Sequence, residues 1–246
     1  MIQTWAVTDI GLVRRENQDA YGIRVDQNND RAVCVVCDGM GGVNGGGVAS
    51  RIAVDTFLQT VEEALPQQPA AEEIRQVSAT AVTAANDAIR SAMAADETYR
   101  GMGTTLVAAV TMADGAVVTN VGDSRAYLIR PGQIKRISKD HSWVETLVDR
   151  GDITEAEARV HPQRNYITRA LGPEPAVQCD GYTVSMEEGE YLLLCTDGLV
   201  STVTDQEMYQ EIQEKCDPDG ALSRLLEISK RRGAADNVTA VLLRKC

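Results

Sequence analysis

The chain has 246 residues and a formal net charge of −12, so it can bury a sizeable core. It lacks the basic surface that binding to nucleic acid or to an anionic membrane requires. It has no apolar run of eighteen residues, and its start, MIQTWAVTDIG, has neither the basic nor the apolar part of a signal peptide. We expect one cytoplasmic domain over residues 1–246, with two small domains as the alternative, and neither nucleic-acid nor membrane partners.

The first part of the chain predicts two neighbouring strands, at 20–25 and 32–37. The glycine-rich residues 41–47 are expected to form a loop, followed by helices at 49–64 and 71–93. The second helix is amphipathic, because its apolar residues recur every three or four positions. These residues are Ile74, Val77, Ala81, Ala85, Ile89 and Met93.

The later part of the chain consists mostly of strand patterns, interrupted by a polar segment over 140–171 with short helices near 143–150 and 155–159. Two further helices are expected at 205–215 and 219–232. Runs of strands between helix pairs predict antiparallel sheets with the helix pairs outside, rather than a doubly wound fold. The strands are predicted at 105–111, 116–120, 126–130, 177–184, 191–196 and 238–244.

Four of the predicted strands have an aspartate at one end. Asp38, Asp123 and Asp197 follow the apolar runs AVCVVC, VVTNVG and YLLLCT, and Asp236 precedes the last strand. Carboxylates placed on one rim of a sheet repel each other strongly unless a cation lies among them. An all-oxygen, acidic site is typical of hard divalent ions, so the pattern predicts Mg²⁺ or Mn²⁺.

Histidine and cysteine offer little alternative metal chemistry. His141 and His161 share one polar stretch, which we expect to lie away from those strand ends, and two histidines alone do not make a histidine-rich zinc site. Cys34 and Cys37 belong to one apolar strand and lie three positions apart, so their side chains should point to opposite faces. The six cysteines are therefore expected to be free thiols in a reducing compartment.

Each acidic motif also has an ordinary interpretation as a turn or as the start of an edge strand. Residues 8–19 fit a solvated loop, although an arginine such as Arg14 can grip a phosphate with two hydrogen bonds and Asp19 can orient a metal-bound water. The joint occurrence of these motifs in this order favours one shared site. The motifs are Asp38-Gly39, Gly122-Asp123-Ser124-Arg125, Asp197-Gly198 and Asp236-Asn237.

The stretches TDIGLVRRENQDA, VVCDGMGG, GMGTTLVAA, VGDSRAYLI, LLLCTDGL and DNVTAVLL, with the segment 140–171, span the chain in a characteristic order. They resemble the metal-dependent protein phosphatases of the 2C type (PPM family), specifically the compact bacterial members. The resemblance implies an α+β fold, a four-layer α/β/β/α sandwich of two mostly antiparallel β-sheets flanked by helix pairs. It also implies a small flap subdomain at about 140–171, beside a metal site at one end of the sandwich.

The resemblance implies two core Mn²⁺ or Mg²⁺ ions and a third, weaker one. Asp38 would bridge the two core ions, and the carbonyl of Gly39 would complete the first site. Asp197 and Asp236 would complete the second site. Asp123 would bring the third ion.

The implied activity is metal-dependent hydrolysis of phosphoserine and phosphothreonine on proteins by a metal-activated water, in opposition to a bacterial Ser/Thr kinase. Arg14 would bind the substrate phosphate, and Asp19 would act on a metal ion through a water. With Asp38, these two residues form the implied catalytic set. Met40 stands where animal members carry a histidine that is a candidate general acid, and a thioether cannot donate a proton.

The expected partners are phosphorylated proteins, with a cognate Ser/Thr kinase and its substrates, and the chain is expected to act as a monomer. One alternative is an inactive member that binds phosphopeptides, but the complete acidic set and Arg14 argue against it. Another is a phosphatase dedicated to one anti-sigma-antagonist-like protein. Such phosphatases usually carry sensor domains, for which this length leaves no room.

Overall fold

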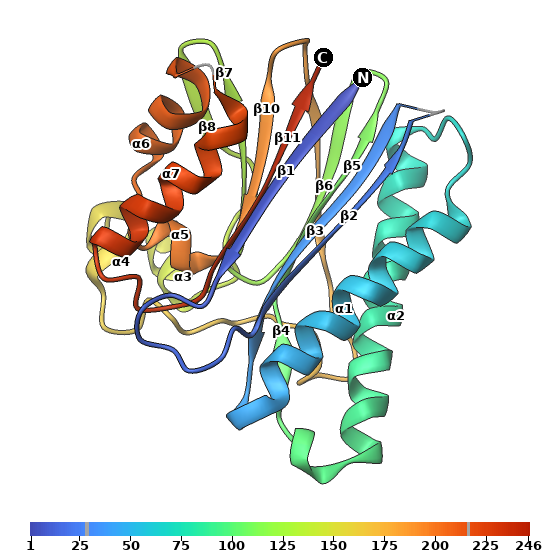
Figure 1. Cartoon of the computed structure of the whole chain (residues 1–246). Helices are drawn as coiled ribbons and strands as arrows, with labels where there is room; N and C mark the ends of the chain where they lie inside the picture. The colour runs from blue at the N-terminus through green and yellow to red at the C-terminus, as the bar shows by residue number, and fades with distance from the viewer. Residues whose placement is uncertain (28–29, 216) are drawn as a thin grey trace.

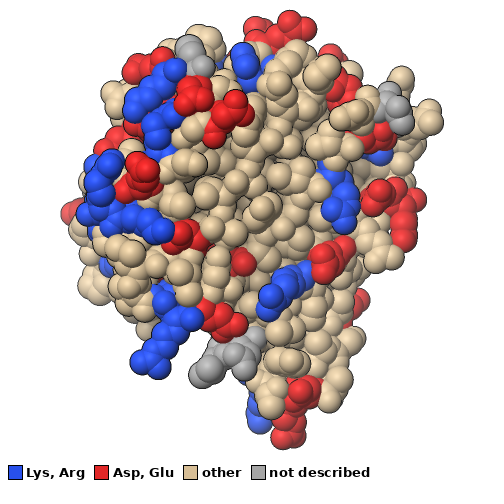
Figure 2. Space-filling view, viewed as in Figure 1, with Lys and Arg blue, Asp and Glu red and all other residues tan. Residues whose placement is uncertain are grey.

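The computed structural model describes residues 1–27, 30–215 and 217–246. Two antiparallel β-sheets lie face to face, and helices cover the outer side of each sheet (Figure 1). This is the predicted α+β, four-layer arrangement, and that prediction is confirmed. Within the described ranges, the helices are too short or too polar to cross a membrane. On the face shown in Figure 2, acidic and basic side chains are interspersed.

The first sheet has the strand order β1-β11-β10-β7-β8, so β11 pairs with both β1 and β10. Its outer face is covered by α5 (Asp197–Val200), α6 (Asp205–Tyr209) and α7 (Pro218–Arg231), with a π-helical turn at Gln210–Glu214 between the last two. Its strands are β1 (Ile2–Asp9), β7 (Arg125–Arg130), β8 (Gln133–Arg136), β10 (Tyr191–Cys195) and β11 (Val238–Lys245).

The second sheet has the order β2-β3-β5-β6-β9, and the short β4 pairs with β3. The long helices α1 (Gly42–Ala64) and α2 (Ala71–Ala95) cover its outer face, and a 3₁₀ turn at Glu97–Tyr99 follows them. Two short helices, α3 (Trp143–Arg150) and α4 (Glu155–Val160), follow β8 and precede β9 in the sequence. The strands are β2 (Asp19–Asp26), β3 (Arg31–Met40), β4 (Gly103–Thr104), β5 (Leu106–Met112), β6 (Gly115–Val121) and β9 (Asp180–Ser185).

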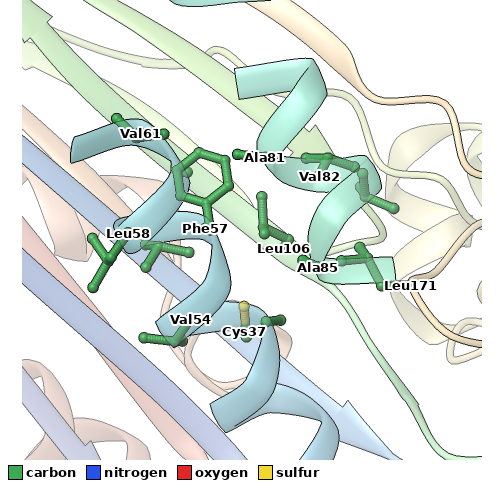
Figure 3. Packing of buried hydrophobic residues seen from close by; sticks show 14 of the residues in the cluster. Cys37, Val54, Phe57, Leu58, Val61, Ala81, Val82, Ala85, Leu106 and Leu171 are labelled. Atoms are coloured by element: carbon green, nitrogen blue, oxygen red, sulfur yellow. The ribbon is translucent and has the colours of Figure 1, made fainter. Parts of the chain in front are cut away.

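Alternation along the strands divides the apolar side chains into three buried layers. In β3, Cys34 and Val36 face the other sheet, while Val35 and Cys37 pack under α1 and α2. Figure 3 shows Cys37 in this outer layer with Phe57 of α1, the single phenylalanine of the chain. Cys34 and Cys37 are therefore on opposite faces, as predicted. The five described cysteines are free thiols, and Cys216 lies outside the described residues.

The predicted loop at 41–47 is wrong, because α1 already begins at Gly42. Glycine has a low helix propensity, but here it allows a close approach between helix and strand. A Cβ on Gly46 would lie 2.7 Å from the backbone of Gly39, and a Cβ on Gly45 would lie 2.9 Å from Met102. Tertiary packing thus overrides local propensity and brings the start of α1 against the end of β3.

Smaller differences between the predicted and the observed elements concern their first or last residues and the short elements. The strand predicted at 177–184 begins only at Asp180, where its pairing with β6 begins, and Val177 and Gln178 line a cavity beside Met40. The helix predicted at 205–215 changes to a π-helical turn after Tyr209. The strands β1, β4 and β8 and the short helix α5 were not predicted.

Candidate active site

Five aspartates from both sheets meet at one end of the sandwich. Asp19 begins β2 and stands opposite Asp38 of β3 in the strand register. Asp123 lies in the turn between β6 and β7, Asp197 follows β10, and Asp236 lies just before β11. The Asp38 carboxyl interacts electrostatically with each of the other four. The fold therefore brings together carboxylates that are as far as 217 positions apart in the sequence.

This crowding changes the protonation of the carboxyls. Burial, and then repulsion from neighbouring carboxylates, raises the pKa of Asp38 well above its ordinary value. Burial likewise raises the pKa of Asp19 to about 7, and the pKa values of Asp123 and Asp197 are also raised. Without positive charge among them, these groups hold protons that exposed aspartates would release.

The donor set fits divalent cations. One buried oxygen each of Asp19, Asp123 and Asp197 has no hydrogen-bond partner among the described residues. Within the described ranges, no three histidine, cysteine or acidic side chains form a ready-made metal cage. Mg²⁺ and similar hard ions keep several waters and take only one or two carboxylates each, so an open acidic rim suits them better than a closed cage.

The end of β3 is braced by two threonines, Thr104 and Thr105, to which the sequence analysis assigned no role. Thr105 donates its backbone N–H to the carbonyl of Asp38 (2.9 Å), and its hydroxyl accepts the N–H of Asp38 (2.9 Å). The hydroxyl of Thr104 also donates to the Asp38 carbonyl (2.8 Å). Both threonines are fully buried. They fix the backbone at Asp38 and thereby the direction of its carboxyl.

Thr196 joins the two sheets at this end. Its hydroxyl donates to the Oδ2 of Asp19 (2.9 Å) and accepts the backbone N–H of Thr239 (3.0 Å). Thr196 is fully buried and directly precedes Asp197 in the sequence. A polar residue at the end of the otherwise apolar strand β10 was the available signal for this role.

The loop that carries Arg14 is held by Asn237. The Asn237 side chain donates to the carbonyls of Ile10 (2.9 Å) and Glu16 (3.0 Å) and accepts the N–H of Gln18 (2.9 Å). Arg14 itself is half exposed, and its Nη2 lies 2.6 Å from the Oδ2 of Asp236. The guanidinium is thus placed beside the carboxylates, where it neutralises one of them.

The expectation that both histidines lie away from the strand ends is wrong for His141. The ring Nδ1 of His141 accepts the backbone N–H of Gly122 (3.0 Å), and the backbone N–H of His141 donates to the Gly122 carbonyl (2.9 Å). Gly122 directly precedes Asp123 and has a φ of 103°, which favours glycine. The buried His141 ring therefore holds the turn that presents Asp123. Sequence patterns gave no sign of this contact, because it closes across 19 residues.

A cleft of about 770 Å³ extends from this site toward the segment 140–171. Its wall includes Asp123 and Asp197, together with Val144 of α3 and Val160 of α4. Arg125 also lines it, but the Arg125 guanidinium is engaged by three hydrogen bonds to the buried Asp140. A second cavity of about 460 Å³ lies beside Met40. Two of the aspartates thus line a hollow large enough for part of a peptide, and the second cavity lies beside Met40, two residues after Asp38.

Comparison with known proteins places the chain in a family. Residues 14–242 match the family model described as protein phosphatase 2C. The chain is 34% identical to the serine/threonine phosphatase stp of Listeria monocytogenes, over 97% of this chain and 94% of that protein. The S. agalactiae serine/threonine phosphatase has a similar structure, with a TM-score of 0.91, 30% identity and full coverage of both chains.

A second solved structure is the catalytic domain of the serine/threonine protein phosphatase PstP in complex with two manganese ions. It has a TM-score of 0.82 and 32% identity, covering 99% of this chain and 97% of that one. The matches extend over nearly the whole chain and agree in fold as well as in sequence. The chain belongs to the protein phosphatase 2C family and has the activity of a protein-serine/threonine phosphatase.

Proposed function

We propose that this phosphatase depends on divalent cations held by its aspartates, acts on phosphoserine and phosphothreonine of proteins, and opposes a bacterial Ser/Thr kinase. The observation that carries the proposal is the group of five aspartates, four of which have raised pKa values and three of which have a buried oxygen without a hydrogen-bond partner among the described residues. Such a group is costly to the fold without cations. A phosphate ester also needs positive charge around its oxygens in order to react.

Within this group, Asp38, Asp197 and Asp236 would hold two ions of Mn²⁺ or Mg²⁺ with the carbonyl of Gly39. Asp19 would hold an ion through a water, and a third ion would be held at Asp123. When bound, such ions polarise phosphoryl oxygens and lower the pKa of water enough to supply a nucleophile near neutral pH. The unpartnered oxygens of Asp19, Asp123 and Asp197 support this assignment.

Arg14 would orient the substrate. Its guanidinium pairs with Asp236. A cation held at Asp236 would take over that charge and leave Arg14 able to grip a phosphate with two hydrogen bonds. Met40 is close to the site but has no proton to give to the departing alkoxide. We further propose that the segment 140–171, which lines the cleft, is the flap beside the active site.

Metal removal tests the proposal directly. We expect a chelator to abolish hydrolysis of a phosphothreonine peptide, and added Mn²⁺ or Mg²⁺ to restore it, because the carboxylates alone repel a phosphate dianion. The measurement is release of inorganic phosphate before and after readdition of each ion. Undiminished turnover in excess chelator would refute the metal-dependent mechanism.

Replacement of Arg14 by alanine is expected to lower kcat/KM by about ten- to a hundredfold, through loss of a charge-assisted contact at a half-exposed position. The neighbouring Arg15 is also exposed and provides a matched control, so Arg15→Ala should leave kcat/KM nearly unchanged. Isothermal titration with Mn²⁺ should give similar affinities for wild type and both variants. Equal kinetics for all three proteins would show that Arg14 does not bind the phosphate.

A further inference from the structure

Large apolar side chains that face water gather on two segments near the aspartates. Among the described residues, nine such side chains are exposed, and six of them belong to residues 10–13 or to the segment 140–171. Isolated exposed apolar side chains are ordinary, whereas a group at one site marks an interaction surface. We call the four most exposed of the six the apolar collar: Leu12 (60% exposed), Val13 (67%), Val160 (78%) and Tyr166 (63%).

The collar lies beside the larger cleft and next to a residue that lines the cavity beside Met40. Val160 lines the larger cleft, and so does Ala235. Leu12 donates its N–H to the carbonyl of Ala234 (2.9 Å), which places the 10–13 segment beside that part of the wall. Tyr166 lies in the chain between Asn165, which lines the larger cleft, and Ile167, which lines the cavity beside Met40. In Figure 1 both segments lie at the same end of the sandwich.

The collar is held in place before any ligand arrives. The side chain of Asn237 bonds the carbonyls of Ile10 and Glu16, so the loop that presents Leu12 and Val13 is tied down on both sides. On the other segment, Tyr166 accepts the N–H of Trp143 (2.8 Å) through its carbonyl. A surface fixed in this way loses little conformational entropy when it binds.

The charged side chains of the cleft give little basis for selecting substrates by their charge. Arginines line it, but most of them are already paired with acidic groups of the protein, so little positive charge remains for an acidic peptide. The pairs are Arg125–Asp140, Arg136–Glu145, Arg159–Asp205 and Arg232–Glu207.

We propose that the apolar collar selects phosphorylated segments of proteins in which apolar side chains stand on both sides of the phosphoserine or phosphothreonine. This inference rests on the proposed function and adds the class of substrate. The phosphate would lie at the aspartates, and the flanking side chains would cover the collar on both sides of it. Their burial removes apolar surface from water, which is the main source of binding free energy for such contacts.

The valines of the chain supply a matched set of variants. Val13→Ser with Val160→Ser removes apolar surface from both sides of the collar, and Val25→Ser makes the same change at an exposed position of β2 (43% exposed) outside the collar. Three substrates are compared: para-nitrophenyl phosphate, a phosphothreonine peptide flanked by leucine and valine, and the same peptide with serine at those positions. Fluorescence anisotropy gives the Kd of each labelled peptide independently of turnover.

With the apolar peptide, the double variant should show KM and Kd raised by about tenfold, while Val25→Ser matches wild type. All three proteins should hydrolyse para-nitrophenyl phosphate alike, because that molecule is too small to reach the collar. The serine-flanked peptide should bind wild type more weakly and be nearly insensitive to the double variant. Unchanged Kd for the apolar peptide, or an equal loss with both peptides, would overturn the inference. A wild-type protein that hydrolyses none of the substrates would instead refute the proposed function, and the anisotropy series would still test the collar.

Discussion

Asp38→Asn is expected to reduce phosphatase turnover by at least about a thousandfold, because Asp38 interacts with all four other aspartates and would hold both core ions. The loss should appear in kcat with phosphopeptide and with aryl phosphate alike. The substitution keeps the size and the backbone contacts of the side chain, so the fold should survive. Asp55→Asn, an exposed position on α1, is the control and should retain full activity.

The same variant should make the metal-free protein more stable at neutral and higher pH. The folded-state pKa of Asp38 is well above the 3.8 of an unfolded chain, so the folded state holds its proton more tightly. That contribution is complete below the unfolded value and is lost as pH rises through the folded pKa. The loss extends past neutrality for the neighbouring Asp19, whose pKa is about 7.

Denaturant unfolding in a chelator, at about pH 5 and about pH 8, measures this effect. The wild type should lose more free energy of unfolding between the two pH values than Asp38→Asn does. Added Mn²⁺ should then raise the melting temperature of the wild type, and raise that of the variant much less, since a ligand of the native state stabilises by mass action. Equal pH dependence and equal Mn²⁺ shifts in both proteins would contradict the crowding of Asp38.

Asp123→Asn is expected to lower turnover by an amount that depends on the leaving group of the substrate. Three other aspartates suffice for two ions, so tight metal binding should persist in calorimetry. Turnover of a phosphothreonine peptide should fall by about a hundredfold, because its leaving alkoxide needs a proton or nearby positive charge and Met40 supplies neither. Hydrolysis of para-nitrophenyl phosphate should fall much less, since a nitrophenolate leaves without such help.

Asp114→Asn, at the exposed turn before β6, is the matched control and should hydrolyse both substrates as the wild type does. Loss of the tight metals along with activity would place Asp123 in the core metal site instead. Full activity on both substrates would show that Asp123 is only a residue of the turn that His141 holds.

The sequence allowed the layers and the acidic positions to be predicted because both depend on local patterns. Alternation in β3 placed Cys34 and Cys37 on opposite faces, and each aspartate follows or precedes a clear apolar strand. The start of α1 was missed because five glycines within 41–47 predict a loop by propensity. The close contact of Gly46 with Gly39 is a tertiary fact that no local pattern contains.

The supporting contacts of the site could not be predicted for a related reason. Asn237 bonds to residues more than 220 positions earlier, and Thr196 bonds to Asp19 across 177 positions. A polar residue beside an acidic motif shows that a partner is needed, but not which residue the fold will bring to it. The strand β1 was missed similarly, because its pairing along Ile2–Asp9 depends entirely on β11.

The place of β11 between β1 and β10 also determines when the enzyme becomes active during its synthesis. Ile2 pairs with Lys245, so β1 has no neighbour in its sheet until residues near 245 have left the ribosome. Asp236 arrives at the same late moment, and pairings so distant in sequence form slowly. An incomplete chain therefore lacks both Asp236, which completes the acidic group, and Asn237, which holds the loop that carries Arg14. Phosphatase activity should begin only when the last strand is inserted, and nascent or truncated chains should leave phosphorylated proteins intact.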